Sequence, residues 1–229
     1  MGVSPRQITA LALLVIAAPL SGTLIGVTIA SDLPTYKPPS RGAPSTRVGG
    51  GTRSMPPAAR QIVVFAPDHT GLTTRAQPSL YWYLSKPATT RVEITSINRQ
   101  AENLLLGLSV ASPSSAGVQK LDLANHGVRL QPGVQYRWHV SLALDPLQRS
   151  NSGAIERIEA SPELAKRLQA TPRAGQGTVY AEEGIWYDAM ASIGDLIEQF
   201  PNDAALRTQR ASLLEQIGLK EAAASDLRR

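Results

Sequence analysis

One stretch decides the fold that this sequence predicts: Leu130-Gln131-Pro132-Gly133-Val134-Gln135-Tyr136-Arg137-Trp138. Its proline and glycine are turn residues, and an alternating strand pattern starts directly after them. We expect the chain to turn between two sheets here, and the hydroxyl of Tyr136 to bond the backbone just upstream. The strand that follows should point Tyr136, Trp138, Val140 and Leu142 into a core, and Arg137, His139 and Ser141 away from it.

Seven short runs of β-branched and aromatic residues, separated by turn residues, predict strands. They cover residues 61–66, 80–84, 91–97, 104–110, 118–121, 134–144 and 154–159. Such spacing is typical of a sandwich, and the Leu-x-Pro-Gly-x-x-Tyr run resembles the tyrosine corner of immunoglobulin-like and fibronectin-like sandwiches. We therefore expect an α+β protein, with an antiparallel β-sandwich over residues 61–160 and a helical tail over residues 161–229.

The run at residues 80–84 alternates two sets of large side chains. Leu80, Trp82 and Leu84 should face the core. Tyr81 and Tyr83 should lie on the outer face or under the tail. As exposed aromatics they could stack on sugar rings, which makes both candidates for ligand binding.

The tail should open with a helix at Ser161-Pro162-Glu163, because this triplet supplies an N-cap, a first-turn proline and an acid. We expect that helix to end by residues 171–172 and a loop containing Gly175 and Gly177 to follow. Further helical segments are expected over residues 179–200, 204–217 and 220–228.

The tail also contains an internal repeat. Gly184 and Gly218 stand 34 residues apart, which is the period of tetratricopeptide repeats. The spacing resembles that family over about one and a half repeats, with glycine in the turn within a repeat and Pro201 between repeats. So short an array is expected to dock on the sandwich. The anchoring stripe would be Ile185, Trp186, Met190 and Ile193.

No catalytic or metal-binding set emerges from the sequence. There is no cysteine, and His69, His126 and His139 are expected to be solvated surface residues without converging partners. The sequence therefore predicts no catalytic residue, no metal and no cofactor. The expected structural residues are Trp82, Tyr136, Trp138, Gly184, Trp186, Pro201 and Gly218.

Two further residues of the tail are ligand-binding candidates, Tyr187 and Asp188. Tyr187 is expected to pack rather than to contact a ligand. Asp188 lies near Glu182 and Glu183, and paired carboxylates could perform acid–base chemistry or bind a cation. A solvated helix face, favoured by the helix dipole, is the preferred interpretation.

The N-terminal residues predict export. Arg6 precedes an apolar run at residues 8–18, so residues 1–30 suit a signal peptide cleaved between Gly22 and Ser31. The alternative is an uncleaved membrane anchor. Either way, the remainder should lie outside the cytoplasm, in the periplasm or beyond, with membrane contact only through an uncleaved segment.

Residues 31–60 predict a disordered basic linker, since they hold six prolines, five basic residues and one acid. Residues 61–229 contain 17 basic and 17 acidic residues, so most of the formal net charge of +5 belongs to the linker. A neutral folded part argues against a nucleic-acid partner, which would require a basic face.

Four segments are similar to one bacterial exported family, the domain of unknown function number nine hundred and twenty-eight. They are residues 49–53 (GGGTR), 72–83 (LTTRAQPSLYWY), 130–149 (LQPGVQYRWHVSLALDPLQR) and 180–189 (YAEEGIWYDA). Two departures suggest a divergent member. Leu144 stands where many members carry cysteine, and the tryptophan that many carry near Gln209 is absent. The resemblance implies no activity and no site residues.

We expect a non-catalytic envelope protein that binds a protein partner or assists assembly. This expectation rests on a sandwich fused to a repeat-like tail on a basic tether, with no catalytic set. A carbohydrate or cell-wall binder is the first alternative. An uncharacterised hydrolase is the second, although the sequence has no Gly-x-Ser-x-Gly elbow and no His-Glu-x-x-His helix.

Overall fold

The computed structural model describes residues 33–39, 62–97, 102–110, 116–142 and 150–228. The export segment at 1–30 lies outside these residues, as do 40–60 of the expected linker and Leu144. The strands are β1 (Ile62–Val64), β2 (Gly71–Thr73), β3 (Ser79–Leu84), β4 (Thr90–Ile97), β5 (Glu102–Val110), β6 (Gly117–Asp122), β7 (Gln135–Leu142) and β8 (Ser150–Arg157). The helices are α1 (Pro162–Ala170), α2 (Arg173–Glu182), α3 (Trp186–Gln199), α4 (Ala204–Gln216) and α5 (Lys220–Leu227), with a short 3₁₀ turn at Leu123–His126.

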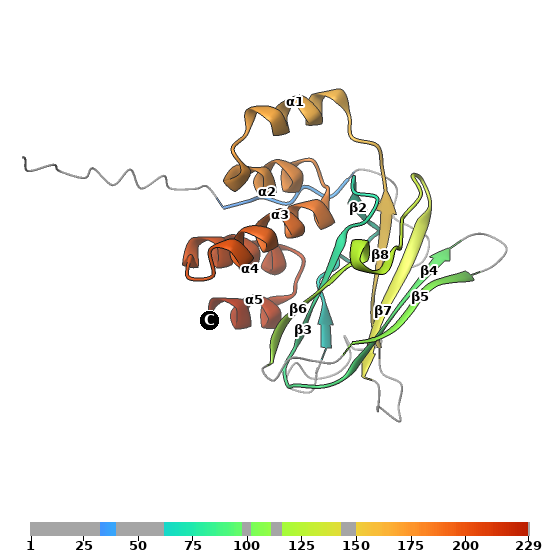
Figure 1. Cartoon of the computed structure of the whole chain (residues 1–229). Coiled ribbons are helices and arrows are strands. Elements are labelled where there is room, and N and C mark those ends of the chain that lie inside the picture. Colours follow the sequence, from blue (N-terminus) through green and yellow to red (C-terminus); the bar gives the residue numbers. More distant parts are fainter. Residues whose placement is uncertain (1–32, 40–61, 98–101, 111–115, 143–149, 229) are drawn as a thin grey trace, which may run out of the picture. The chain divides into compact units, whose positions relative to one another are not determined.

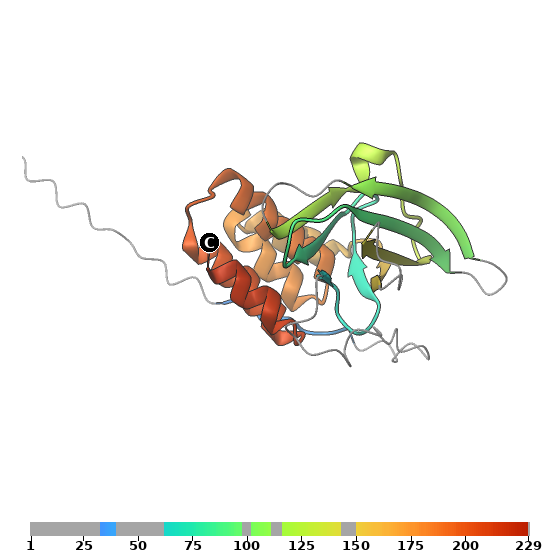
Figure 2. The same cartoon turned by 90° about the horizontal axis from the view of Figure 1, so that it is seen from below.

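The strands form two sheets, in the orders β1-β3-β6 and β2-β8-β7-β4-β5. All seven predicted strands are present, and β2 is an eighth that the sequence did not predict. β2 pairs with β8 in parallel, so the expectation of a purely antiparallel arrangement is wrong. A three-residue strand leaves almost no periodic signal. The helices gather on one side of the sheets (Figures 1 and 2).

The corner that precedes β7 has the hydrogen bond expected from the sequence. The backbone N–H of Gln131 donates to the hydroxyl of Tyr136 over 2.9 Å. Tyr136, Trp138 and Val140 are buried, which confirms the inward face of β7. Leu142 is only half-buried but packs against the same core.

The helices begin and end close to their expected positions. Ser161 caps α1 by accepting the N–H of Leu164 over 3.1 Å. The loop expected around Gly175 and Gly177 is wrong, because α2 runs through both residues. A Cβ on Gly177 would lie 2.7 Å from Ile193 of α3, so the absence of a side chain permits a close helix crossing there.

The four helices after α1 form two successive helical hairpins, α2–α3 and α4–α5, each packed across a short turn. Gly184 lies in the first turn and Gly218 in the second, both with positive φ, at 73° and 80°. Pro201 lies between α3 and α4. The two glycines thus lie in turns between helices and the proline in a connector, at the positions expected from the internal repeat. No helix in the part of the chain described above is long and apolar enough to cross a membrane.

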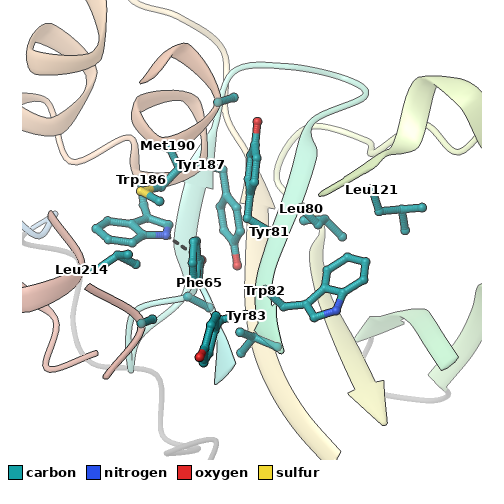
Figure 3. Packing of buried hydrophobic residues seen from close by; sticks show 14 of the residues in the cluster. Phe65, Leu80, Tyr81, Trp82, Tyr83, Leu121, Trp186, Tyr187, Met190 and Leu214 are labelled. Carbon is teal, nitrogen blue, oxygen red and sulfur yellow. Dashed lines mark hydrogen bonds between the residues drawn. The ribbon is translucent and has the colours of Figure 1, made fainter. Parts of the chain in front are cut away.

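Strand β3 is covered on both faces. Figure 3 shows Leu80 and Trp82 on the side of Leu121, away from the helices. Tyr81 and Tyr83 lie on the side that carries Trp186, Tyr187 and Met190 of α3 (Figure 3). Both tyrosines are buried, at 3% and 8% exposed, so the prediction that they are exposed aromatics available to sugar rings is wrong. The sequence left two positions open for these tyrosines, the outer face or under the helical tail, and both lie under the tail.

Candidate binding site on the helical layer

The run Gly184-Ile185-Trp186-Tyr187-Asp188-Ala189 starts α3 and joins the helices to the sheets. Trp186 is fully buried, and its Nε1–H donates to the carbonyl of Phe65, just after β1, over 2.9 Å. An indole buried against an apolar core is costly unless its N–H is bonded, so this contact orients the ring. Trp186 therefore packs, as predicted.

Tyr187 contacts the larger sheet, through Trp138 of β7 and Ala154 of β8. Its hydroxyl accepts the indole N–H of Trp138 over 2.9 Å and donates to the carbonyl of Ala154 over 3.0 Å. Burial raises the pKa of Tyr187 above the ordinary tyrosine value. With both hydrogen-bonding functions used inside the core, this residue serves packing rather than ligand contact.

Asp188 is fully buried, so the expectation of a solvated helix face is wrong for this residue. Its carboxylate accepts the backbone N–H of Thr74 over 2.9 Å, the hydroxyl of Thr73 over 2.5 Å and the hydroxyl of Thr74. The last residue of the short strand β2 and the residue after it thus supply the donors that a buried carboxylate requires. A carboxylate saturated in this way fixes β2 to the start of α3.

Glu182 and Glu183 do not join Asp188. Both pair with Arg167 of α1, Glu182 over 2.7 Å, and all three of these side chains are substantially exposed. The predicted cluster of carboxylates is therefore divided between a buried anchor and a surface ion-pair group. In the described part of the chain, no group of three or more metal-ligating side chains converges.

A charged group links α3 to β6 beside Tyr81. Nζ of Lys120 lies 3.1 Å from both Asp195 and Glu198 of α3. Burial lowers the pKa of Lys120, but the influence of Tyr81 and the bonds to Glu198 and Asp195 outweigh it and raise the pKa overall. The hydroxyl of Tyr81 has no hydrogen-bond partner among the described residues, and burial raises its pKa. Opposite charges compensate one another here, which suits a structural contact.

Residues 33–39, expected to belong to the disordered linker, instead lie extended against the helices. We call this segment the strap. The side-chain amide of Gln216, at the end of α4, clamps its backbone: Oε1 accepts the N–H of Tyr36 and Nε2 donates to the carbonyl of Pro34, each over 2.8 Å. The N–H of Lys37 donates to the carbonyl of Ala181 in α2 over 3.1 Å.

The strap inserts Tyr36 into a socket made by His69 and Trp186. The rings of Tyr36 and His69 are nearly parallel with centroids 5.9 Å apart, and Trp186 meets Tyr36 edge-on at 4.9 Å. The Tyr36 hydroxyl lies 2.8 Å from Nε2 of His69, whose Nδ1 lies 3.5 Å from Asp68. His69 is therefore a packed, bonded residue rather than the solvated one predicted.

The order Asp68–His69–Tyr36 resembles a relay that could activate a hydroxyl. Burial, and secondarily the charge of Asp68, raise the pKa of Tyr36, which disfavours a phenolate nucleophile at neutral pH. The hydroxyl is also enclosed, since Tyr36 is 7% exposed. The arrangement suits recognition of a tyrosine better than catalysis.

Sequence reasoning missed Tyr36 and Gln216. One signal was present, because Tyr36 is the only aromatic residue in 31–60 and prolines flank it at 34 and 38. Proline-rich extended segments are a recurrent class of recognition segment, and they dock in grooves lined by aromatic residues. Gln216 offered no signal, since it is one polar residue among several on an exposed helix end.

Comparisons with known proteins add a family. Among solved structures, one similar chain is titled "X-Ray photoreduction of Polysaccharide monooxygenase CBM33", with a TM-score of 0.24 and 15% identity over 40% of this chain and 60% of that chain. The chain thus spans 60% of the length of that structure. No curated protein matches the sequence. A family model matches residues 48–227, most of the chain, and the protein belongs to that family, described as Domain of Unknown Function (DUF928).

Proposed function

We propose that this protein is an exported, non-catalytic module that binds or assembles protein partners by holding an extended polypeptide segment against its helical layer. One observation carries the proposal: the helices already hold such a segment, the strap at 33–39. Gln216 and Ala181 bond its backbone, and the socket of His69 and Trp186 receives its one aromatic side chain.

The arrangement of the helices supports this function. The two hairpins, with glycines at 184 and 218 and a proline at 201, fit a tetratricopeptide-like tail, and the Tyr136 corner fits an immunoglobulin-like or fibronectin-like sandwich. Stacked helical hairpins create extended surfaces that suit peptide binding. The sandwich then serves as the support on which a short array is stable.

A non-catalytic role fits the chemistry of the buried polar groups. The hydroxyl of Tyr187 and both carboxylate oxygens of Asp188 are hydrogen-bonded to neighbouring groups. The carbohydrate alternative is not carried forward, because the aromatics it depended on, Tyr81 and Tyr83, are buried. Export rests on the apolar segment within residues 1–30, and the proposed partner is accordingly an envelope protein, with no nucleic acid involved.

Site-specific photo-crosslinking in cells tests the proposal. A photoreactive residue at Ser212, which bonds Gln216 within α4, would be compared with one at the exposed Glu163 of α1. We expect a discrete envelope protein crosslinked from position 212 and not from position 163. Absence of any crosslink from position 212, combined with hydrolase activity or retention on wall polymers, would overturn the proposal.

A further inference from the structure

The groove that the strap occupies contacts a specific pattern of strap side chains. We define the groove by His69, Ala181, Gly184, Trp186 and Gln216. Along the strap, Pro34 and Tyr36 are buried, whereas Leu33, Thr35, Lys37 and Pro38 are exposed. This alternation is that of an extended chain with one face bound. The bound face therefore carries the side chains of Pro34 and Tyr36, a Pro-x-Tyr pattern. Thr35 and the residues after Tyr36 contact the groove mainly through their backbone.

The groove combines a backbone clamp with a side-chain socket. Gln216 bonds the carbonyl of residue 34 and the N–H of residue 36, as a neighbouring strand would. These two bonds involve only backbone atoms of the strap, so they can form with any extended segment. Selectivity comes from the socket, where a tyrosine ring fits between His69 and Trp186 and its hydroxyl meets Nε2 of His69.

At one position of the groove, Gly184, the strap lies so close that there is no room for a side chain. A Cβ on Gly184 would lie 2.6 Å from the carbonyl oxygen of Lys37 and 3.2 Å from Pro39. The residue adopts φ of 73°, which glycine tolerates without strain. Gly184 therefore serves both the α2–α3 turn and the passage of an extended segment across it.

When the strap leaves the groove, none of the residues that define the groove is left as a buried charge without a partner. Gln216 is exposed, so water can satisfy its amide when the strap departs. Trp186 stays anchored through its bond to the carbonyl of Phe65, which is independent of the strap. A socket that keeps its shape when empty loses little free energy to reordering when an occupant arrives.

The match to the family covers the groove but not its occupant. His69, Ala181, Gly184, Trp186 and Gln216 all lie within residues 48–227, whereas the strap at 33–39 precedes them. The strap and β1 belong to one chain, so the strap is a tethered ligand, and tethering raises its effective concentration at the groove. A tethered ligand of this kind competes with any free one.

From these contacts we propose that the groove recognises a Pro-x-Tyr segment in extended conformation, and that the strap occupies it in cis until a segment of the same kind from a partner protein replaces it. This inference rests on the proposed function and names the chemistry of the partner. It assigns the strap an autoinhibitory role in addition to a structural one.

The test uses the full chain with Tyr36→Ala, which empties the socket but keeps the groove. A fluorescent peptide of sequence Leu-Pro-Thr-Tyr-Lys-Pro-Pro, matching residues 33–39, would be titrated and followed by anisotropy. We expect the Tyr36→Ala chain to bind it at least tenfold more tightly than the unaltered chain, whose own strap competes. Peptides with alanine in place of tyrosine, or of the first proline, should bind at least tenfold more weakly.

The matched control is the double variant Tyr36→Ala with Gln216→Ala, in which the backbone clamp is missing. It should lose at least tenfold in affinity for the same peptide. Thermal melting of each variant establishes that the chain is folded. A folded Tyr36→Ala chain that does not bind the peptide would overturn the inference and leave the strap as a fixed part of the fold.

A second measurement covers the case in which Tyr36→Ala does not fold. A protease site placed at Gly49–Gly51 of the otherwise unaltered chain allows the connection to the strap to be cut after folding. Upon dilution, we expect the strap fragment to leave and the labelled peptide to take its place; a fragment that never exchanges counts against the inference. Crosslinking from position 212 to a partner segment without Pro-x-Tyr would overturn the inference while sustaining the proposed function.

Discussion

Removing one oxygen atom, by Tyr187→Phe, should strongly destabilise the contact between helices and sheets. The hydroxyl accepts the N–H of Trp138 and donates to the carbonyl of Ala154, and Trp138 and Ala154 are both buried. Without it, the indole N–H of Trp138 loses its acceptor inside an apolar core. We expect the free energy of unfolding to fall by about 2 to 4 kcal/mol, the usual cost of leaving two buried polar groups unpaired.

Tyr81→Phe is the matched control, because it removes the same atom from a buried tyrosine whose hydroxyl has no partner among the described residues. Its unfolding free energy should be unchanged or higher by about 1 kcal/mol, since an unpaired buried hydroxyl is itself unfavourable. Urea unfolding followed by circular dichroism compares the two. A loss of about 3 kcal/mol lowers the midpoint by about 1.5 M at a slope near 2 kcal/mol/M. Equal effects of the two variants would refute the assignment of the Tyr187 hydroxyl.

Three further predictions concern pH, the turn and a buried ion pair. The folded pKa of Tyr187 is raised above its ordinary value of 10.0, so its contribution to stability is complete well below pH 10 and is lost as pH rises beyond it. The destabilisation by Tyr187→Phe should therefore shrink by about 1 kcal/mol between pH 10 and 11 in urea titrations. Gly184→Ala should lower the unfolding free energy by at least about 1 kcal/mol, because a Cβ there is strained by positive φ and meets Lys37; an unchanged melting temperature would contradict this. Asp226→Asn should cost about 3 to 5 kcal/mol by leaving the buried guanidinium of Arg210 without its two-point partner, whereas the double variant Arg210→Met with Asp226→Leu should recover most of that loss in the same assay.

Local patterns in the sequence predicted much of the fold. The Pro-Gly turn before Tyr136 predicted the corner, and its hydroxyl bond is present. Ser161 predicted the start of α1, and the spacing of Gly184 and Gly218 predicted both helix turns. Each of these turns and caps forms within a few residues along the chain, so the local sequence contains the information. The repeat spacing adds a second copy of the same local signal 34 residues further on.

The errors have a common origin in contacts between distant segments. β2 is three residues long and is defined by parallel pairing to β8. Asp188 looks like an exposed first-turn acid in the sequence, but Thr73 at the end of that strand and Thr74 just after it supply its donors. Periodicity says that one face of a segment is apolar, but it does not say how many layers cover it, and Tyr81 was misjudged as an exposed ligand contact for that reason.

The candidate site likewise combines features that local sequence predicts with contacts that only the folded chain shows. The sequence by itself determined the apolar N-terminal segment, every strand of the two sheets except β2, and most of the helical segments, because these depend on local propensity and periodicity. Only the tertiary structure decided that Tyr36 lies between His69 and Trp186, and that Gln216 bonds the strap's backbone. Those contacts join residues far apart in sequence, and a hydrogen bond from a side-chain amide to a backbone leaves no pattern in either segment. The binding groove is therefore a property of the folded chain.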